Sequence, residues 1–239
     1  MTKEKLRVEV IGDLDETEAR AFVYGDDKIG WDGIIKDNPD AAAKMPEDEV
    51  KWEEIKEICG SNMGLLISVV EEARSWGNWE DAFEAVLKGP LSEVMGGFSP
   101  HLMPKRSSVL PDWNKGQWEK VLQRLLTAPS HAVLFRELAA ELGDGDVGET
   151  ALMSMVEFNL LTLRPASKLA HDLPQEVFVV KKEVALEEQT EKVVKQKGEV
   201  VTLPSPAHVY AAKLHIAKLR KKKFSNKKNK KKVEGNLTP

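Results

Sequence analysis

Residue types that bind phosphate and magnesium are present in this sequence, but not in the arrangement that nucleotide hydrolysis needs. A Walker A loop places glycines around a Lys-Ser or Lys-Thr pair, so that backbone amides and the lysine surround the phosphates. The sequence has no Gly-Lys-Ser or Gly-Lys-Thr, and no apolar strand ends in two acidic residues that would hold magnesium. The pair Asp26-Asp27 follows a predicted helix instead. For this chain alone we therefore expect no nucleotide hydrolysis, no catalytic residue, no metal site and no cofactor.

Serine, cysteine and histidine chemistry lacks the necessary spacing as well. The run Gly60-Ser61-Asn62-Met63-Gly64 does not have the Gly-x-Ser-x-Gly spacing of a nucleophile elbow, and it follows a predicted helix, which favours a helix cap. A single cysteine, Cys59, excludes an internal disulfide framework and a four-ligand Cys/His zinc site. The five histidines show no metal-ligand spacing: His101, His131, His171, His208, His215.

The elements that would position any site begin with a short strand and a helical unit over residues 1–88. With 41% hydrophobic and 31% charged residues, the 239-residue chain is typical of a soluble globular protein with one large or two small domains. Alternating β-branched residues predict a strand over 6–11, and 25–46 predicts an irregular loop. Apolar periodicity predicts helices over 16–24, 47–58, 63–76 and 79–87, the last ending at Gly89-Pro90.

Three capping signals fix the ends of these helices. Asp15 precedes Glu18 by three residues, which is the spacing of a capping box at the start of the first helix. Gly60 stands where a glycine in the left-handed conformation ends a helix. Asn62 is placed to cap the helix over 63–76.

The second half of the chain predicts a winged-helix domain over 115–219. Residues 89–114 hold four prolines and three glycines, so they predict an interdomain linker. Three helices, two short strands and a final helix then follow in the order of a winged helix. The predicted helices cover 117–126, 133–142, 149–159 and 207–219, and the strands cover 160–163 and 200–203.

A charged insertion, 165–199, separates these two strands. Within it, 176–180 would extend the sheet, and 183–197 alternates in charge like an exposed helix. Residues 220–239 predict a disordered basic tail. The expected fold class is mostly α, with a helical lid-like bundle, a winged helix carrying a small β-hairpin, and this tail.

The helix over 149–159 occupies the position of a DNA-recognition helix in a winged-helix domain. Its polar residues offer no lysine or arginine to a phosphate backbone, which favours a structural or protein-binding role. These residues are Glu149, Thr150, Ser154, Glu157 and Asn159.

The net charge of −4 hides an acidic body and a basic end. Residues 213–239 hold eleven basic side chains and one acidic, while the other 212 residues hold 24 basic and 38 acidic. The tail predicts a solvated segment or a salt-sensitive, sequence-blind contact with RNA, an acidic surface or an import receptor. Its basic residues are Lys218, Arg220, Lys221, Lys222, Lys223, Lys227, Lys228, Lys230, Lys231 and Lys232.

No apolar run reaches the length of a membrane-spanning helix, and the first residues lack the apolar core of a signal peptide. We therefore expect an intracellular protein, cytoplasmic or nuclear. The chain enters a buried-type strand almost at once, as an internal fragment or a shortened gene model would. In that case organelle targeting is not assessable from this N-terminus.

Two motifs resemble the archaeal-type, STAND (AAA+-like) P-loop ATPases. Residues 8–19, with the Gly12-Asp13-Leu14 turn, are similar to the segment that opens that family's helical lid, and 58–66 resembles the lid's glycine turn over the adenine. Met63 stands where the family usually has proline, and the Walker A and B core is missing. The resemblance covers about 6–220 and implies a lid followed by a winged helix. It also implies a set of cofactor-binding residues, namely Gly60, Asn62, Gly64 and Arg74.

The leading hypothesis is thus a non-catalytic regulatory or interaction fragment that contacts a protein partner. ATP and magnesium would be bound only with an upstream P-loop domain, and the whole would then be an ATP-binding switch. The alternatives are a nucleic-acid-binding winged-helix protein that uses its lysine-rich tail, and a plain protein adaptor. The oligomeric state is not predicted.

Overall fold

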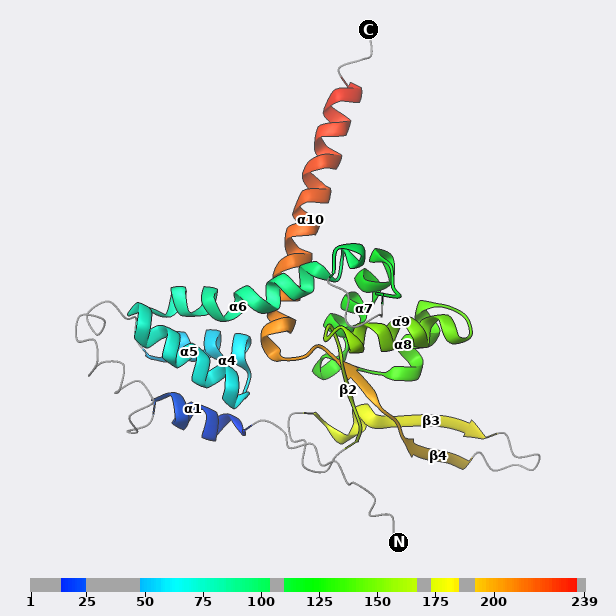
Figure 1. Cartoon of the computed structure of the whole chain (residues 1–239), viewed down its shortest axis with the longest axis horizontal. Coiled ribbons are helices and arrows are strands. Elements are labelled where there is room, and N and C mark those ends of the chain that lie inside the picture. Colours follow the sequence, from blue (N-terminus) through cyan, green and yellow to red (C-terminus); the bar gives the residue numbers. More distant parts are fainter. Residues whose placement is uncertain (1–13, 25–47, 104–109, 167–172, 185–191, 236–239) are drawn as a thin grey trace.

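The computed structural model describes residues 14–24, 48–103, 110–166, 173–184 and 192–235. Over these residues the chain is mostly helical, with a small three-stranded antiparallel sheet and a separate two-stranded one (Figure 1). The strand predicted over 6–11 and the loop predicted over 25–46 lie outside the described residues.

The N-terminal helical unit is formed by α1 (Glu16–Tyr24), α4 (Asp48–Cys59), α5 (Met63–Trp76) and the first half of α6 (Trp79–Gly96). The predicted bounds of α1 and α5 are confirmed, and those of α4 differ by one residue at each end. Its core buries one face of each helix, because apolar residues recur at helical spacing. The fully enclosed members include Val23, Ile55, Leu66, Val69 and Trp79.

The predicted caps explain where these helices begin or end. The Asp15 carboxylate accepts from the Glu18 amide at 2.8 Å, and Glu18 accepts from the Asp15 amide at 3.1 Å, which completes the capping box. The Asn62 side chain accepts from the Leu65 amide at 3.1 Å. Gly60 has φ +58° and ends α4 as predicted.

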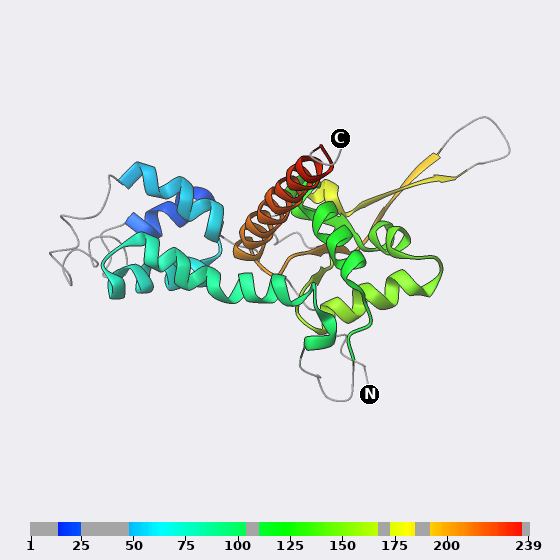
Figure 2. The same cartoon turned by 90° about the horizontal axis from the view of Figure 1, so that it is seen from above.

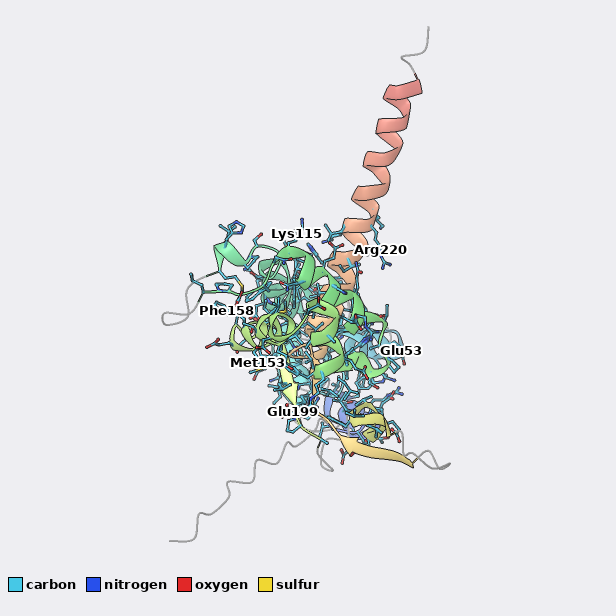
Figure 3. All side chains as sticks on the ribbon, turned by 90° about the vertical axis from the view of Figure 1, so that its right-hand side faces the viewer. Glu53, Lys115, Met153, Phe158, Glu199 and Arg220 are labelled. Atoms are coloured by element: carbon cyan, nitrogen blue, oxygen red, sulfur yellow. The ribbon has the colours of Figure 1, made fainter. Side chains whose placement is uncertain are left out.

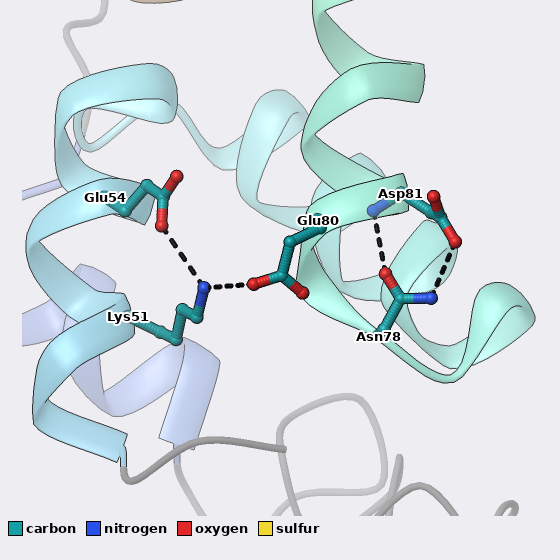
Figure 4. A network of polar contacts seen from close by, with 5 residues as sticks. All are labelled: Lys51, Glu54, Asn78, Glu80 and Asp81. Carbon is teal, nitrogen blue, oxygen red and sulfur yellow. Dashed lines mark hydrogen bonds and ion pairs between the residues drawn. The ribbon is translucent and has the colours of Figure 1, made fainter. Parts of the chain in front are cut away.

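A lysine with little solvent exposure joins α4 to α6 (Figure 4). Lys51 Nζ lies 2.5 Å from Glu80 and 3.4 Å from Glu54, and it faces the ring of Phe83 at 5.8 Å. Burial opposes the charge on Lys51, but its bonds to Glu80 and Glu54 outweigh burial and hold the pKa of Lys51 above its usual value. The ion pair therefore stays formed at neutral pH and fixes the start of α6, which Asn78 caps by accepting from the Asp81 amide at 2.8 Å.

The predicted end of this helix at Gly89-Pro90 is wrong, because α6 continues through Pro90 to Gly96. An interior proline removes one backbone hydrogen bond and costs about 3 kcal/mol. Burial at both ends of the helix offsets that cost: Trp79 packs in the helical unit, while Val94 packs in the second core. The first part of the predicted linker, 89–96, is accordingly part of a helix that spans two cores (Figure 2).

The sheet unit is formed by α7 (Lys115–Thr127), β1 (Ala132–Leu134), α8 (Phe135–Leu142), α9 (Asp146–Glu157), β2 (Thr162–Arg164) and β5 (Val200–Thr202). Short 3₁₀ turns, Pro100–Leu102 and Pro129–His131, precede α7 and β1. The strand order is β1-β5-β2, all antiparallel. The helix predicted over 133–142 is corrected: its first two residues belong to β1, because they pair with β5.

The insertion between β2 and β5 forms a hairpin rather than a helix. A 3₁₀ turn, Gln175–Phe178, leads into β3 (Val179–Val184), which pairs with β4 (Lys192–Lys197). The exposed helix predicted over 183–197 is therefore wrong where it is described. The extension of the main sheet by 176–180 is also wrong, since β3 belongs to the two-stranded sheet. Valines in both segments favour extended backbone, and cross-strand pairing satisfies it.

The last helix, α10 (Pro206–Gly235), packs against both units and then leaves the body (Figures 1 and 2). Ala207 is buried in the core of the helical unit, whereas Ala211, Ala212 and Ile216 are buried in the core of the sheet unit. The helix was predicted to end at 219 and to be followed by a disordered tail, but it runs to Gly235. Lysine and alanine are good helix formers, and no proline or glycine interrupts 207–234.

The junction of α6 and α7 should be the most sensitive point of the sheet unit. Trp118 is fully buried and donates to the Val94 carbonyl at 3.0 Å, and its ring fills the space where a Cβ on Gly97 would sit, at 2.5 Å. Trp118→Ala should lower the free energy of unfolding by about 3–5 kcal/mol in a denaturant titration. Trp76→Ala is the matched control, because Trp76 is 58% exposed; it should cost below about 1 kcal/mol. Equal losses in the two variants would show that this junction is not a core.

A candidate binding groove and two charged helices

A groove of about 910 Å³ lies between the helical unit and the sheet unit. This volume is in the range of small-molecule sites. The helical unit contributes the start of α1, the second half of α4 and the glycine turn. The sheet unit contributes β2 and β5, and the start of α10, which packs against both units, completes the lining. Hydroxyl and charged side chains predominate in the lining, including Ser61, Ser130, His131, Thr162, Arg164, Thr202 and Ser205.

Gly60 borders this groove for a packing reason. Its φ of +58° is a left-handed conformation that side chains with a Cβ rarely adopt. A Cβ added there would also meet Pro206 Cγ at 2.8 Å. The glycine thus lets the turn after α4 approach the first residue of α10.

The residues implied by the family resemblance separate in space. Gly60 and Asn62 line the groove, and the Ser61 carbonyl between them accepts from the Leu14 amide at 3.1 Å. Gly64 is on the first turn of α5 and is absent from the groove lining. Arg74 is on the last turn of α5, about 18 Å along the helix from Asn62. The structure therefore brings together two of the four.

Ion pairs already neutralise much of the charge in the groove. Lys56 lies 2.7 Å from Glu16, and Lys213 lies 3.6 Å from Glu57. The hydrogen bond from Lys56 holds the pKa of Glu16 below its usual value, and the same bond raises the pKa of Lys56. These pairs connect α4 to α1 and to α10, and they reduce the attraction of the groove for a charged ligand.

Sequence reasoning missed a chain of hydrogen bonds at the end of the groove. Ser205 Oγ lies 2.7 Å from His208 Nδ1, and His208 Nε2 lies 3.0 Å from Glu93 Oε2. The order resembles a nucleophile, a base and an acid, but the residue after the serine is Pro206, which has no N–H to offer to an oxyanion. We interpret these two hydrogen bonds as a link, or clamp, that holds α6 against the start of α10. The Ser-Pro start of a helix is visible in the sequence, whereas Glu93 is not a predictable partner.

Other unusual groups near the groove have structural explanations. Ser130 and His131 adopt positive φ, +56° and +51°, and the His131 ring meets the Leu125 carbonyl at 3.1 Å at the end of α7. Cys59 is buried, and burial raises its pKa to about 12, so the thiol stays neutral and unreactive.

Outside the groove, α9 presents a surface with no basic residue. Val147 and Met153 are 60% and 47% exposed, and Asp146, Glu149 and Thr150 are exposed beside them. Positions 146, 149, 150 and 153 lie along one side of a helix. Of the residues predicted for this helix, Ser154 is buried and accepts from the Asp112 amide at 3.0 Å, while Glu157 and Asn159 are exposed.

All ten predicted tail residues lie on α10, from Lys218 onward. Lys218, Arg220 and Lys221 are exposed where the helix leaves the body, and Figure 3 labels Arg220 at that point. The other seven follow on the helix as it continues to Gly235: Lys222, Lys223, Lys227, Lys228, Lys230, Lys231, Lys232.

Comparison with known proteins adds no assignment. No protein-family model, curated protein or solved structure matches the chain. Among the described residues, no group of three or more His, Cys, Asp or Glu side chains is placed to hold a metal ion. The described helices also include none with the length and apolar character to cross a membrane.

The packing of Gly60 leads to a test with a matched glycine. Gly60→Ala should lower the free energy of unfolding by about 1–2 kcal/mol, because the Cβ is strained at positive φ and displaces Pro206. Gly89→Ala is the control, since Gly89 is inside α6 with no heavy atom within 4 Å of an added Cβ. It should raise stability by about 0.5–1 kcal/mol. Thermal or urea unfolding of both variants measures the difference, and a neutral Gly60→Ala would contradict the close approach.

Proposed function

We propose that this chain is a non-catalytic protein-interaction module made of a lid-like helical unit and a winged helix. The winged-helix assignment is supported by the order α7-β1-α8-α9-β2-β5 and by the sheet order β1-β5-β2. The hairpin of β3 and β4, which interrupts β2 and β5, then takes the position of the wing. In this arrangement α9 is the helix that a DNA-binding member would insert into the major groove.

The composition of the outward side of α9 carries this proposal. A helix that docks on DNA needs lysine or arginine near the phosphates, because phosphate contacts supply most of the affinity. The exposed side of α9 instead combines Asp146 and Glu149 with the apolar Val147 and Met153. Acidic residues there repel the DNA backbone, and exposed apolar side chains on a helix are typical of a surface that binds protein.

The groove supports a regulatory role for the module. It lies where the helical unit meets the sheet unit, so a group that enters it touches both. If a nucleotide-binding domain is covalently attached or bound, Gly60 and Asn62 can complete a nucleotide site that the other domain mainly holds. ATP and magnesium would then be cofactors of that assembly, in keeping with the family resemblance.

Substitutions on α9 separate a protein-binding helix from a DNA-recognition helix. Thr150→Ala combined with Met153→Ala should leave the affinity of the full chain for duplex DNA within about twofold, measured by fluorescence anisotropy. A recognition helix that lost two base-edge contacts would lose about tenfold or more. Such a loss would overturn the protein-binding assignment, and sustained ATP turnover by the purified chain would overturn the non-catalytic one.

Nucleic-acid binding through α10 is a second candidate function, favoured by one observation. The helix runs to Gly235 and carries ten basic residues and one acidic residue over 218–235. Such a helix attracts phosphates by charge alone, without reading sequence.

The salt dependence of RNA binding measures this contribution. Replacing Lys218, Arg220 and Lys221 by alanine should reduce the slope of log affinity against log salt by about 2 for single-stranded RNA. The matched control removes three exposed charges elsewhere, Arg20, Lys88 and Lys115, and should leave the slope unchanged. Equal slopes in the two triple variants would remove α10 as the binding element.

A further inference from the structure

We propose that the outward side of α9 binds the basic segment of α10, residues 218–235, from a second copy of this chain. Two chains would thereby form a salt-sensitive dimer. This rests on the proposal that α9 is a protein-binding helix, and it names the partner. The proposal is based on two surfaces of one molecule that point in different directions: the acidic, partly apolar side of α9 and the basic segment of α10.

Charge complementarity points to this occupant. The segment 135–157, which contains α8 and α9, holds six acidic residues and one basic residue. The segment 218–235 of α10 holds ten basic residues and one acidic residue. Two arginines reduce this acidic excess without cancelling it: Arg124 of α7 pairs with Glu141 at 2.8 Å, and Arg136 borders a small hollow with Asp144 and Glu149.

The direction of α10 makes the contact intermolecular. Its first half is fixed in both cores by Ala207, Ala211 and Ile216. Its second half then rises away from α8 and α9 in Figure 1, and Figure 3 shows Arg220 and Met153 on different sides of the body. A helix that continues in this direction does not meet α9 of its own chain.

The dimensions of the two helices also match. Residues 218–235 extend about 27 Å and the twelve residues of α9 extend about 18 Å, so the basic segment covers the full length of α9. Because each chain offers one copy of each helix, a two-fold axis pairs both at once. Lysine stems can cover exposed apolar side chains while their ammonium groups reach carboxylates, and Val147 and Met153 are exposed beside Asp146 and Glu149.

Sedimentation of the full chain tests the proposal. At about 50 mM salt the Debye length is about 14 Å, and we expect a mass near twice 26.7 kDa. At about 500 mM salt the charges are screened, and we expect a mass near 26.7 kDa. The protein must be free of nucleic acid, since RNA competes for α10. A mass of one chain at low salt, with binding of a single-stranded RNA to the same protein, would overturn the proposal in favour of RNA.

Charge reversal identifies the surfaces. Asp146→Lys with Glu149→Lys should abolish the dimer, as should Arg220→Glu with Lys221→Glu, and mixing the two variants should restore a one-to-one complex. The control, Glu71→Lys with Glu84→Lys, reverses two exposed acids of the helical unit and should dimerise at least as well as the unaltered chain. If the control loses the dimer equally, the attraction is a general charge effect and α9 is not the site.

The outcomes of this experiment and of the proposed function are distinguishable. A chain that is monomeric at every salt concentration, with DNA affinity insensitive to Thr150→Ala and Met153→Ala, leaves α9 as a protein-binding helix and removes only the second copy as its partner. DNA affinity that falls in those variants removes the proposed function as well.

Discussion

The burial of one short stretch of α10 in two cores determines how the described parts of this molecule fit together. Ala207, Ala211 and Ala212 have no exposed surface, and the first belongs to the helical unit while the others belong to the sheet unit. Small side chains allow helices to approach closely, and α6 crosses the same boundary with Trp79 in one core and Val94 in the other. Rotation of either unit against the other would expose these residues to water, so both units move as one body unless α10 detaches.

The same packing of α10 explains why a glycine is needed in the turn after α4, which the sequence alone does not reveal. A glycine in this position resembles an adenine-binding turn, yet here it meets Pro206 at the start of α10. The first turns of α10 are held by three sets of contacts: the glycine turn, the two cores, and the clamp of Ser205, His208 and Glu93. A ligand in the adjoining groove would therefore bear directly on the point where the two units are joined.

Local signals in the sequence predicted the helical unit well, and long-range contacts account for most errors. The bounds of α1 and α5 follow from caps formed within four residues, so the sequence contains all the information. Pro90 predicted a helix end, because the burial of Val94 against a core far along the chain is not visible locally. Val133 and Leu134 of β1 were predicted as helix, since only pairing with β5, some 66 residues later, makes them a strand. Gly60 and Asn62, which the resemblance implied as site residues, line the groove, whereas His208 and Glu93 come together only through the crossing of α6 and α10.

The basic segment of α10, unlike the packed first turns of the helix, is destabilised by repulsion between its own charges. Like charges three or four residues apart destabilise a helix by a few tenths of a kcal/mol per pair, and 218–232 contains many such pairs. The packed first turns supply the costly nucleus, so each further residue needs only to extend an existing helix. A surface of opposite charge that meets this segment relieves the repulsion, and by linkage it stabilises the helix by as much as the helix strengthens the contact. Attraction for acidic surfaces and the helical state of this segment are consequently coupled equilibria: salt weakens the attraction, and it also weakens the repulsion that opposes the helix.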